Sequence, residues 1–523
     1  MKKNNLKKAF ALGLSTALVS MSCLNASAID YKNILNKKNI SIAALGSAVI
    51  LGSYFLYNHF KAPSAEKPQD ERQLVKKNND QIKKSEKNKE ESEQVKEALK
   101  AIQNREVNGT TNPIMFEGVK PITEDEKSKI VSAKSCSKRG KKITVQVTEL
   151  DSWNTDAETI LSDGKTRVGE MDLRKNPGKY FRQDKESGMC YIKLGDELYE
   201  AGKFVMPTLA RVSEKAQSKD KKDGKMFVVY ADSGTSGLEL LSMETMLDSK
   251  KFDLANSASS QNCIETYGSG DYGPVEGEVK SLSDYCGERT QGPAFMLKCP
   301  WTSLCLLHMP GLNGMVYDKE RQEYSEQKVD KINLLKPYGI ETSSGYGINL
   351  ASETGFGEDK KEDNDKFTCL IVKDAPISFD GGDIHTSQTY IYSDEDKKID
   401  IFLDAALPYA HRDSENYTEE QCKLHIKRHY LTLFESCRAE GVNRAMISFI
   451  GTDRLGNKFE WHKEALDNPE VKEAMKNSGT TYIFNAYNKS DIAKVFIGQA
   501  VDISSATDMS AFDKIVNGEW KVG

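Results

Sequence analysis

A loop with two glycines is the clearest candidate for chemistry in this chain. It covers residues 451–457, Gly-Thr-Asp-Arg-Leu-Gly-Asn, and follows the apolar run 445–450, which has the length and composition of a buried strand. A loop that leaves a strand in this way can present backbone N–H groups to an anion. The sequence therefore predicts an anion-binding loop here, with Asn457 capping the helix that follows it.

A second glycine-rich segment leads into a pair of carboxylates. The segment is 268–274, and Glu276 and Glu278 follow it, two positions apart. Glycine is the usual residue where a turn needs positive φ, and the helix dipole favours glutamates at the start of a solvated helix. From the residues alone, these structural interpretations are simpler than a catalytic one.

Cysteine and histidine occur close together between residues 294 and 309. Cys299, Cys305 and His308 lie in that stretch, and an imidazole beside a thiol can generate a nucleophilic thiolate. The stretch is apolar, however, and cysteine is among the most buried residue types. We therefore interpret it as core.

Two other sets of residues raise the question of a metal. His425 and His429 share a helix face at i, i+4, but no third ligand stands at an informative spacing. A surface or half-buried histidine pair is the simpler interpretation. Asp380 and Asp383 flank two glycines and most simply form a turn, with calcium left open. The sequence predicts no metal site and no cofactor.

The elements around the first loop indicate an α/β sheet. A helix with Ile426, Tyr430 and Phe434 on one face ends at Gly441, before the apolar strand that feeds the loop. After the loop comes a second helix, and 480–485 returns as another strand. Two strands joined by a helical crossover pair in parallel, and ligands then sit outside their carboxyl ends.

In this order the pieces resemble a macrodomain, the α/β fold that binds ADP-ribose, and within it the poly(ADP-ribose) glycohydrolase branch. One block is 252–259, a strand that ends in Asn and small residues, followed by the glycine-rich segment and 276–279. The other block is 430–487, with its helix, strand, loop, helix and strand. The chain departs from the family pattern in four ways. The first loop lacks a run of three glycines, the two glutamates are not adjacent, Asp453 and Arg454 stand where small residues are commoner, and residues 295–374 intervene where a minimal macrodomain is compact.

The resemblance implies a mixed sheet flanked by helices, and it assigns roles to residues. Glu276 or Glu278 would protonate the departing oxygen of a ribosyl bond, as glycoside hydrolysis requires. The implied ligand-binding residues are Asp248 for adenine, Asn256 for the distal ribose, Gly270 and Gly273 in the first loop, Gly451, Thr452 and Gly456 for the diphosphate, and Phe484 and Asn485 near adenosine.

The start of the chain predicts membrane attachment. Residues 1–28 combine lysines, an apolar run and a small-residue cleavage pattern, which is typical of a signal peptide. Residues 40–60 have the length and composition of a transmembrane helix. Residues 61–110 are rich in charged side chains, and this composition predicts a helical or disordered tether. We expect a single-pass, membrane-anchored protein and leave the side of the membrane open.

The remainder is expected to fold. We predict an α+β accessory region at 115–215, beginning with an alternating strand at 141–149, and a macrodomain-like α/β domain at 222–505 with an insertion at 295–374. The net charge of −5 gives no reason to expect nucleic acid. The ten cysteines contain no CxxC pair, so a disulfide scaffold is not expected.

Three functions fit these patterns. The first is a membrane-tethered protein of the bacterial envelope that binds ADP-ribose or an ADP-ribosylated protein and hydrolyses ADP-ribosyl glycosidic bonds. The second is a non-catalytic module that recognises ADP-ribose or a related nucleotide. The third is an envelope-anchored protein that binds a protein partner and has no nucleotide site.

Overall fold

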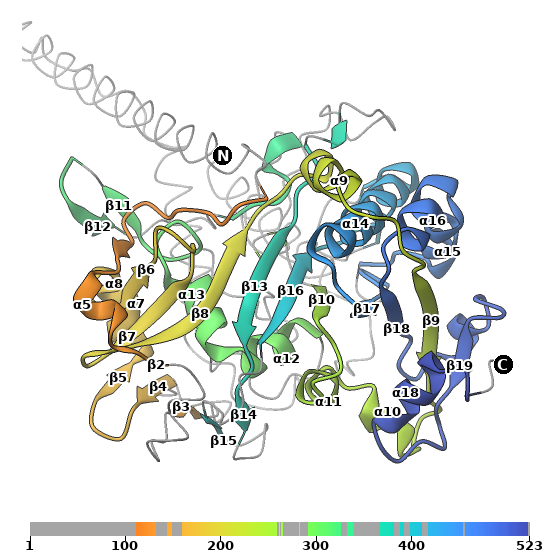
Figure 1. The fold of residues 1–523 in the computed structure, drawn as a ribbon, viewed down its shortest axis with the longest axis horizontal. Coiled ribbons are helices and arrows are strands. Elements are labelled where there is room, and N and C mark those ends of the chain that lie inside the picture. Colours follow the sequence, from red (N-terminus) through yellow and green to blue (C-terminus); the bar gives the residue numbers. More distant parts are fainter. Residues whose placement is uncertain are drawn as a thin grey trace, which may run out of the picture. The chain divides into compact units, whose positions relative to one another are not determined.

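One large mixed sheet organises the residues whose structure can be described (Figure 1). The computed structural model describes residues 111–131, 144–148, 159–258, 261, 263–264, 282, 291–318, 320–325, 332–338, 363–364, 366–380, 387–391, 398–410, 417–452 and 455–520. The predicted signal peptide, membrane helix and tether lie outside these residues. Within them, we find no helix whose length and apolarity would let it cross a bilayer.

The described residues form a 12-stranded sheet in the order β1-β6-β7-β8-β13-β16-β10-β17-β18-β9-β19, with β2 paired to β8. Its strands are β1 (Lys120–Pro121), β2 (Ile130–Val131), β6 (Phe181–Gln183), β7 (Cys190–Leu194), β8 (Glu197–Val205), β9 (Lys225–Tyr230), β10 (Leu254–Ala258), β13 (Leu370–Pro376), β16 (Lys398–Asp404), β17 (Arg444–Ser448), β18 (Thr481–Asn485) and β19 (Ala500–Asp502).

Half of this sheet is parallel. Strands β16, β10, β17, β18, β9 and β19 all run the same way, whereas β13 is antiparallel to both β16 and β8. The predicted parallel pairing of the strands at 445–450 and 480–485 is confirmed, because β17 and β18 pair from Arg444↔Thr481 to Ser448↔Asn485. Six carboxyl ends therefore lie along one edge of the sheet.

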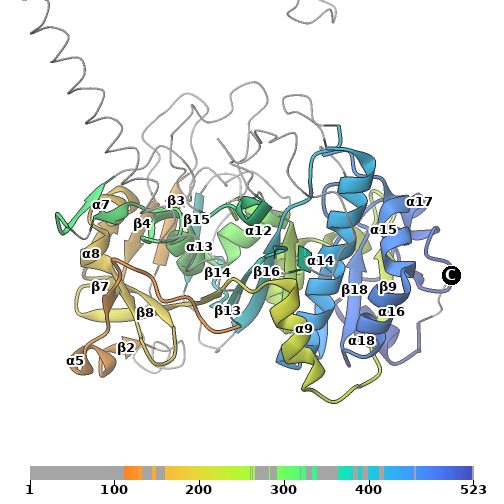
Figure 2. The ribbon, with the colours of Figure 1, turned by 90° about the horizontal axis from the view of Figure 1, so that it is seen from above.

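Helices cover both faces of the large sheet. They are α9 (Leu209–Gln217), α10 (Gly237–Leu240), α11 (Met243–Asp248), α12 (Gln291–Lys298), α13 (Pro300–His308), α14 (Glu419–Glu440), α15 (Phe459–Asp467), α16 (Pro469–Lys476), α17 (Ser490–Ala493) and α18 (Ser510–Val516). Helix α14 packs beside α9, α15 and α16 (Figures 1 and 2). Along β16, Ile401 and Leu403 belong to one buried cluster and Phe402 to the other, as alternation in a strand covered on both faces requires. The expectation of an α/β fold with a mixed sheet flanked by helices is thus confirmed.

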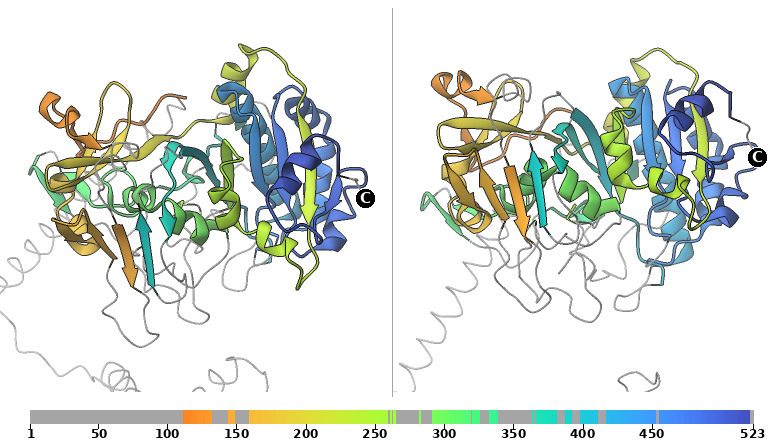
Figure 3. Two further views of the ribbon diagram at one scale, coloured as in Figure 1. Left: turned by 60° about the horizontal axis from the view of Figure 1, so that its bottom comes forward. Right: turned by 90° about the horizontal axis from the view of Figure 1, so that it is seen from below.

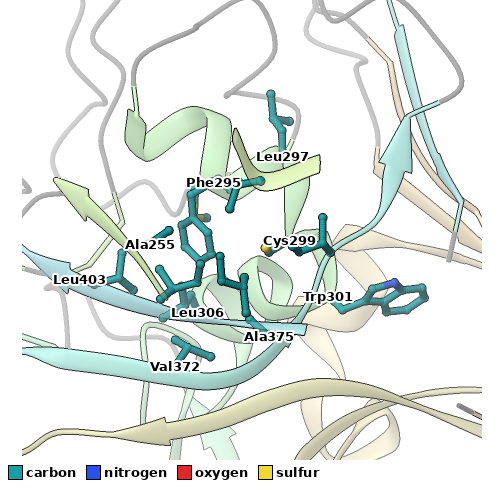
Figure 4. Close-up of a cluster of buried hydrophobic side chains, with 14 of the residues drawn as sticks. Ala255, Phe295, Leu297, Cys299, Trp301, Leu306, Val372, Ala375 and Leu403 are labelled. Carbon is teal, nitrogen blue, oxygen red and sulfur yellow. The ribbon is translucent and has the colours of Figure 1, made fainter. Parts of the chain in front are cut away.

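The core between α12, α13 and the sheet is closely packed (Figure 4). Phe295 and Leu306 reach from the helices toward Ala255 of β10 and Val372 of β13. All four side chains are almost completely shielded from solvent. Burial of large apolar side chains contributes on the order of 1.5–3 kcal/mol each, which fixes α12 against β10 and α13 against β8 and β13.

A second sheet and a hairpin complete the described part. The sheet has the order β14-β15-β3-β4-β5, and β11 pairs with β12 (Figure 3). These strands are β3 (Thr144–Thr148), β4 (Thr159–Ser162), β5 (Arg167–Gly169), β11 (Val316–Asp318), β12 (Glu323–Ser325), β14 (Phe379–Asp380) and β15 (Ser387–Ile391). The strand predicted at 141–149 is β3. The remaining short helices are α5 (Glu124–Lys127), α7 (Glu170–Lys175) and α8 (Pro177–Tyr180).

The large sheet continues across the boundary that the sequence suggests between residues 215 and 222. Strand β8, from the accessory region, pairs with β13 at Val205↔Ile371, Phe204↔Val372 and Lys203↔Lys373. Residues 295–374 supply half of α12, all of α13 and much of β13. The accessory region, the insertion and the α/β domain therefore share one sheet.

Candidate ligand-binding site

The strands β10 and β17 meet at a point where the chain changes direction. From β10 it continues toward β13 and β16 on one side, whereas from β17 it continues toward β18 on the other. Direct pairing of β10 with β17 ends early, at Ala255↔Met446. Ligands of parallel α/β sheets bind in the crevice outside the carboxyl ends at such a switch point. This edge is where the sequence places the ligand site.

Asn256 bridges three strands at the switch point. Its side chain is fully buried, its Nδ2 donates to the Phe402 carbonyl oxygen of β16 at 3.3 Å, and its Oδ1 accepts from the Ser448 N–H of β17 at 3.3 Å. The Ser448 hydroxyl donates to the Asn256 carbonyl oxygen at 3.0 Å. The amide therefore holds β10 between its neighbours, and its contact with a ribose remains a prediction.

A buried carboxylate fixes the loop that follows β16. Asp404 accepts the N–H of Ala405 on Oδ1 at 2.7 Å and the His429 Nδ1–H on Oδ2 at 2.9 Å. His425 Nε2 donates to the Ala405 carbonyl oxygen at 2.7 Å. The three polar side chains are at most 3% exposed. Together they set the course of residues 405–410.

The histidine pair is therefore neither on the surface nor half-buried, and that expectation was wrong. Burial lowers the pKa of His425, and the nearby Asp404 charge opposes this only in part. Neutral His425 carries its proton on the nitrogen that contacts Ala405, because that contact requires a donor. Among the residues that the structure describes, no group of three or more His, Cys, Asp or Glu side chains is placed to hold a metal ion.

At the two glycine positions of the predicted anion loop, neighbouring residues leave no space for a side chain. Gly451 has φ +68° and Gly456 has φ +70°, both in the left-handed region that glycine occupies without strain. A Cβ on Gly451 would lie 2.3 Å from the Ala406 Cβ, and one on Gly456 would lie 2.7 Å from the Ala410 Cβ. The loop after β17 is thus pressed against the loop after β16.

Backbone hydrogen bonds join the same two loops. The N–H of Tyr409 donates to the Leu455 carbonyl oxygen at 2.8 Å, and the N–H of Asn457 donates to the Gly451 carbonyl oxygen at 3.0 Å. Asn457 Nδ2 donates to the Leu407 carbonyl oxygen at 2.9 Å. Asn457 does not cap α15 as the sequence suggested: the cap position is Lys458, and its side chain makes no capping bond.

Donors remain available at this loop. In the described part of the chain, the backbone N–H groups of Gly451 and Thr452 donate no hydrogen bond. Helix α15 begins close by, and its uncapped N–H groups give that end a partial positive charge. The Lys458 ammonium lies 5.5 Å from the Tyr409 ring centroid and 5.1 Å from that of Trp461. The Lys458 ammonium also pairs with Glu419 at 3.2 Å, so an anion here would meet backbone donors, a helix N-terminus and a lysine that already has a carboxylate partner.

Phe484 and Asn485, the residues predicted to lie near adenosine, are the last two residues of β18. Phe484 is fully buried, with ring centroids 5.8 Å from Tyr430 and 5.4 Å from Phe449. Asn485 Nδ2 donates to the Leu241 carbonyl oxygen at 2.5 Å. Their proximity to a nucleoside remains a prediction, since both side chains are engaged in packing or in holding the α10 region.

The other predicted site residues fall into two groups. Asp248 is described, and it pairs with the buried ammonium of Lys298 at 2.8 Å, so a contact with adenine would compete with that ion pair. The remaining residues lie outside the described residues: Glu276, Glu278, Gly270 and Gly273.

Two exposed residues at this edge were missed from the sequence. Asp232 lies two residues after the end of β9 and is exposed, and its N–H donates to the Ser504 hydroxyl at 2.9 Å. Tyr487 follows β18, is 46% exposed and has φ +51°. Their position in the sequence could have identified both residues, because each comes just after an apolar run that forms a strand. An exposed carboxylate and an exposed ring are both suited to contact a nucleobase.

The cysteine and histidine residues near 299–308 belong to the core, as interpreted. Burial raises the pKa of the Cys299 and Cys305 thiols well above the ordinary value. His308 contacts Glu170 at 2.6 Å. Thiols held neutral in this way are poor nucleophiles.

Comparison with proteins of known structure finds glycohydrolases. Poly(ADP-ribose) glycohydrolase from Thermomonospora curvata, bound to the inhibitor ADP-HPD, matches with a TM-score of 0.29 and 8% identity, over 56% of this chain and 85% of that one. The same enzyme from Deinococcus radiodurans, in complex with ADP-ribose, matches with a TM-score of 0.27 and 9% identity, over 56% and 95%. This chain is similar to bacterial poly(ADP-ribose) glycohydrolases, the branch that its motifs resemble.

These likenesses are remote. No protein-family model matches the chain, and no curated protein matches it. TM-scores below 0.3 give no correspondence between individual residues, so the roles of residues rest on the contacts of this chain alone.

Proposed function

We propose that this protein binds ADP-ribose, free or attached to a protein, at the carboxyl edge of its parallel sheet and hydrolyses ADP-ribosyl glycosidic bonds. The observation that carries the binding step is the Gly451 loop. Among the described residues, its Gly451 and Thr452 N–H groups donate no hydrogen bond, and the loop follows β17 at a topological switch point and precedes a helix without a side-chain cap. These features together suit a diphosphate.

Hydrolysis is assigned to the carboxylates that the sequence singles out. Glu276 or Glu278 would donate a proton to the departing oxygen as its bond to the anomeric carbon breaks and positive charge builds on that carbon. A water oxygen would then bond to the anomeric carbon and give its proton back to the carboxylate. The Gly451 loop would hold the diphosphate and so orient the ribose. A macrodomain-like core is part of this proposal, as is membrane anchoring through residues 40–60.

The binding step can be tested by calorimetric titration of ADP-ribose into the full chain. Thr452→Glu places a negative charge on the loop, at a position that is only partly buried. Thr452→Gln is the matched neutral control. We expect saturable binding in the wild type and in Thr452→Gln, and at least a tenfold weaker affinity in Thr452→Glu, about 1.4 kcal/mol. Equal affinities in the two variants would remove the loop from the site.

The catalytic step needs a separate measurement. Glu276→Gln and Glu278→Gln are assayed for release of ADP-ribose from an ADP-ribosylated protein, alongside titration of free ADP-ribose. We expect at least one variant to lose turnover while its affinity for ADP-ribose is unchanged. Binding without turnover in the wild type would leave the non-catalytic recognition module as the function, and absence of binding would favour the partner-binding protein.

A further inference from the structure

Asn457 is a buried amide whose two ends are treated differently. The residue is only 3% exposed. Its Nδ2 donates to the Leu407 carbonyl oxygen at 2.9 Å and to the Gly451 carbonyl oxygen at 3.3 Å. Its Oδ1 has no hydrogen-bond partner in the part of the chain that the structure describes. The two carbonyl acceptors also fix which end of the amide is the NH₂ group, because turning the amide over would set oxygen against oxygen.

Stability alone does not account for this side chain, because a buried acceptor without a donor costs free energy. Neither carbonyl oxygen depends on the amide alone. The Leu407 oxygen also accepts from the Cys422 thiol at 3.8 Å, and the Gly451 oxygen also accepts the backbone N–H of Asn457 at 3.0 Å. An apolar side chain of similar size would avoid the unpaired Oδ1. The explanation for the amide therefore lies in what it holds in place.

The Asn457 side chain ties the Gly451 loop to the loop after β16. The bond from its backbone N–H stays within the Gly451 loop, whereas its Nδ2 reaches Leu407 in residues 405–410. The buried Asp404 carboxylate fixes the start of that second loop. The amide fits only against glycine, because a Cβ on Gly451 would lie 2.6 Å from Asn457 Nδ2. The position of Gly451 is thus set relative to the end of β16.

The same contacts set the direction of a backbone donor. The Gly451 carbonyl group belongs to the peptide unit that carries the Thr452 N–H. This peptide bond is trans, so its C=O and N–H groups point in nearly opposite directions. Because the carbonyl oxygen faces the buried Asn457 side chain, the Thr452 N–H faces away from it, and Thr452 is partly exposed. This N–H donates no hydrogen bond to any described residue, so it is open to a ligand.

We propose that Asn457 is a positioning residue for the diphosphate of ADP-ribose. By holding the Gly451 carbonyl oxygen, it turns the Thr452 N–H outward and keeps this donor at a fixed place relative to β16. A donor that is already oriented costs less to engage than one that the ligand must order. Asn457 acts in this way without touching the ligand. The inference deepens the proposed function and rests on it for the identity of the ligand.

Hydrogen exchange tests the tie between the two loops without any ligand. The exchange rate is measured in the full chain at Tyr409, whose N–H donates to the Leu455 carbonyl oxygen across the two loops. We expect about tenfold faster exchange in Asn457→Ala and in Asn457→Leu, which keeps a similar size. Asn468→Ala is the matched control, because the Asn468 side chain also bonds the backbone but caps α16. A wild-type exchange rate at Tyr409 in both Asn457 variants would overturn the tie.

Nuclear magnetic resonance and calorimetry test the direction of the donor. The Thr452 amide proton of the isotope-labelled full chain is followed while ADP-ribose is added. We expect a downfield shift, the mark of a new hydrogen bond to a charged oxygen, in the wild type and Asn468→Ala, and little shift in Asn457→Ala and Asn457→Leu. The affinity of these two variants for ADP-ribose should be about tenfold weaker, with an unchanged affinity for adenosine, which lacks the diphosphate. An equal loss for adenosine would overturn the proposal, because the effect would then be a general change in the fold.

Inorganic pyrophosphate separates the two failures. If ADP-ribose does not bind to the wild type, the proposed function fails, and pyrophosphate then decides the positioning role. A shift of the Thr452 amide with pyrophosphate that disappears in Asn457→Ala would support that role, and no shift in the wild type would overturn it. If the wild type binds ADP-ribose but the Thr452 amide does not shift, or if Asn457→Ala binds as tightly as the wild type, the proposed function stands and the positioning role is wrong.

Discussion

Gly451 and Ala406 lie so close that a methyl group on Gly451 would stand 2.3 Å from the Ala406 Cβ. The contact joins the loops that follow β17 and β16, across β10 in the sheet. Since both strands are anchored in the core, neither loop can move away without distorting the edge at which we propose the ligand binds. The fit between the two loops is therefore a requirement of the site.

Gly451→Ala should destabilise the protein more than an ordinary glycine replacement. Gly441 provides the control, because it also has positive φ, at +72°, but has nothing within 4 Å of its Cβ position. Gly441→Ala should cost about 1–2 kcal/mol from left-handed strain alone. Gly451→Ala adds steric overlap and should cost more in urea-induced unfolding. Equal losses in the two variants would show that the loops separate readily.

Asp404→Asn should lower the free energy of unfolding by about 1–3 kcal/mol, the cost of leaving a buried donor without an acceptor. An amide can serve the Ala405 N–H or the His429 Nδ1–H, but its NH₂ group then faces the other donor. The control is Asp253→Asn, in which an exposed carboxylate accepts the N–H groups of Asn443 and Arg444. Chemical denaturation should show a clearly smaller loss for Asp253→Asn, since water can replace its bonds.

Asn256→Ala should be destabilising for a reason unrelated to any ligand. It leaves the Phe402 carbonyl oxygen and the Ser448 N–H buried without the amide, and we expect a loss of about 1–3 kcal/mol. Thr452→Ala, at a partly exposed position on the same edge, should stay within about 0.5 kcal/mol of the wild type. Thermal unfolding measures both. A loss of ADP-ribose binding in Asn256→Ala would report on the ligand site only if thermal unfolding shows that the variant is still folded.

Stability should fall as the pH drops below about 6.5, because of buried histidine. Burial, with a smaller contribution from the charge of His429, lowers the pKa of His462 from 6.5 to about 3. Above pH 6.5 the imidazole is neutral in both the folded and the unfolded state. Between pH 6.5 and about 3 only the unfolded state takes up the proton, so the free energy of unfolding decreases by up to about 1.4 kcal/mol per pH unit.

The variant His462→Gln separates this effect from other titrations. It removes the titrating group and keeps an acceptor for the Tyr430 hydroxyl, which lies 2.7 Å from His462 Nδ1. Denaturation curves at pH 7.5 and pH 5.5 should differ less for the variant than for the wild type. An identical pH dependence in both proteins would mean that His462 does not contribute.

Local patterns in the sequence predicted the elements well where they repeat at short range. Helix α14 ends at Gly441, whose φ of +72° and ψ of +35° give a left-handed cap, and it begins after Thr418, whose side chain forms a capping box with Gln421. Strands β10, β17 and β18 begin and end within one or two residues of the strands expected at 252–259, 445–450 and 480–485. Periodicity and capping act within a few residues, so a single sequence records them.

Contacts between distant segments could not be predicted from local patterns in the sequence. Asp404 and His429 are separated by 25 residues, and Glu170 and Leu282 by 112. No spacing rule connects them, because each pair is brought together only when the sheet has formed. Asn457 has the right residue type to cap α15 but lies one residue before the cap position, and its side chain contacts the Leu407 carbonyl oxygen instead. The glycines at 451 and 456 were recognised, but the loop they press against was not.

The pairing of β8 with β13 also bears on how this chain can be divided. A fragment starting near residue 222, the boundary that the sequence suggests, would lack β8 and would bare the backbone of β13 beside Ile371 and Val372. An unpaired apolar edge of this kind is a template for pairing between copies. We expect such a fragment to be recovered in inclusion bodies, and one that begins near residue 111 to be recovered in solution.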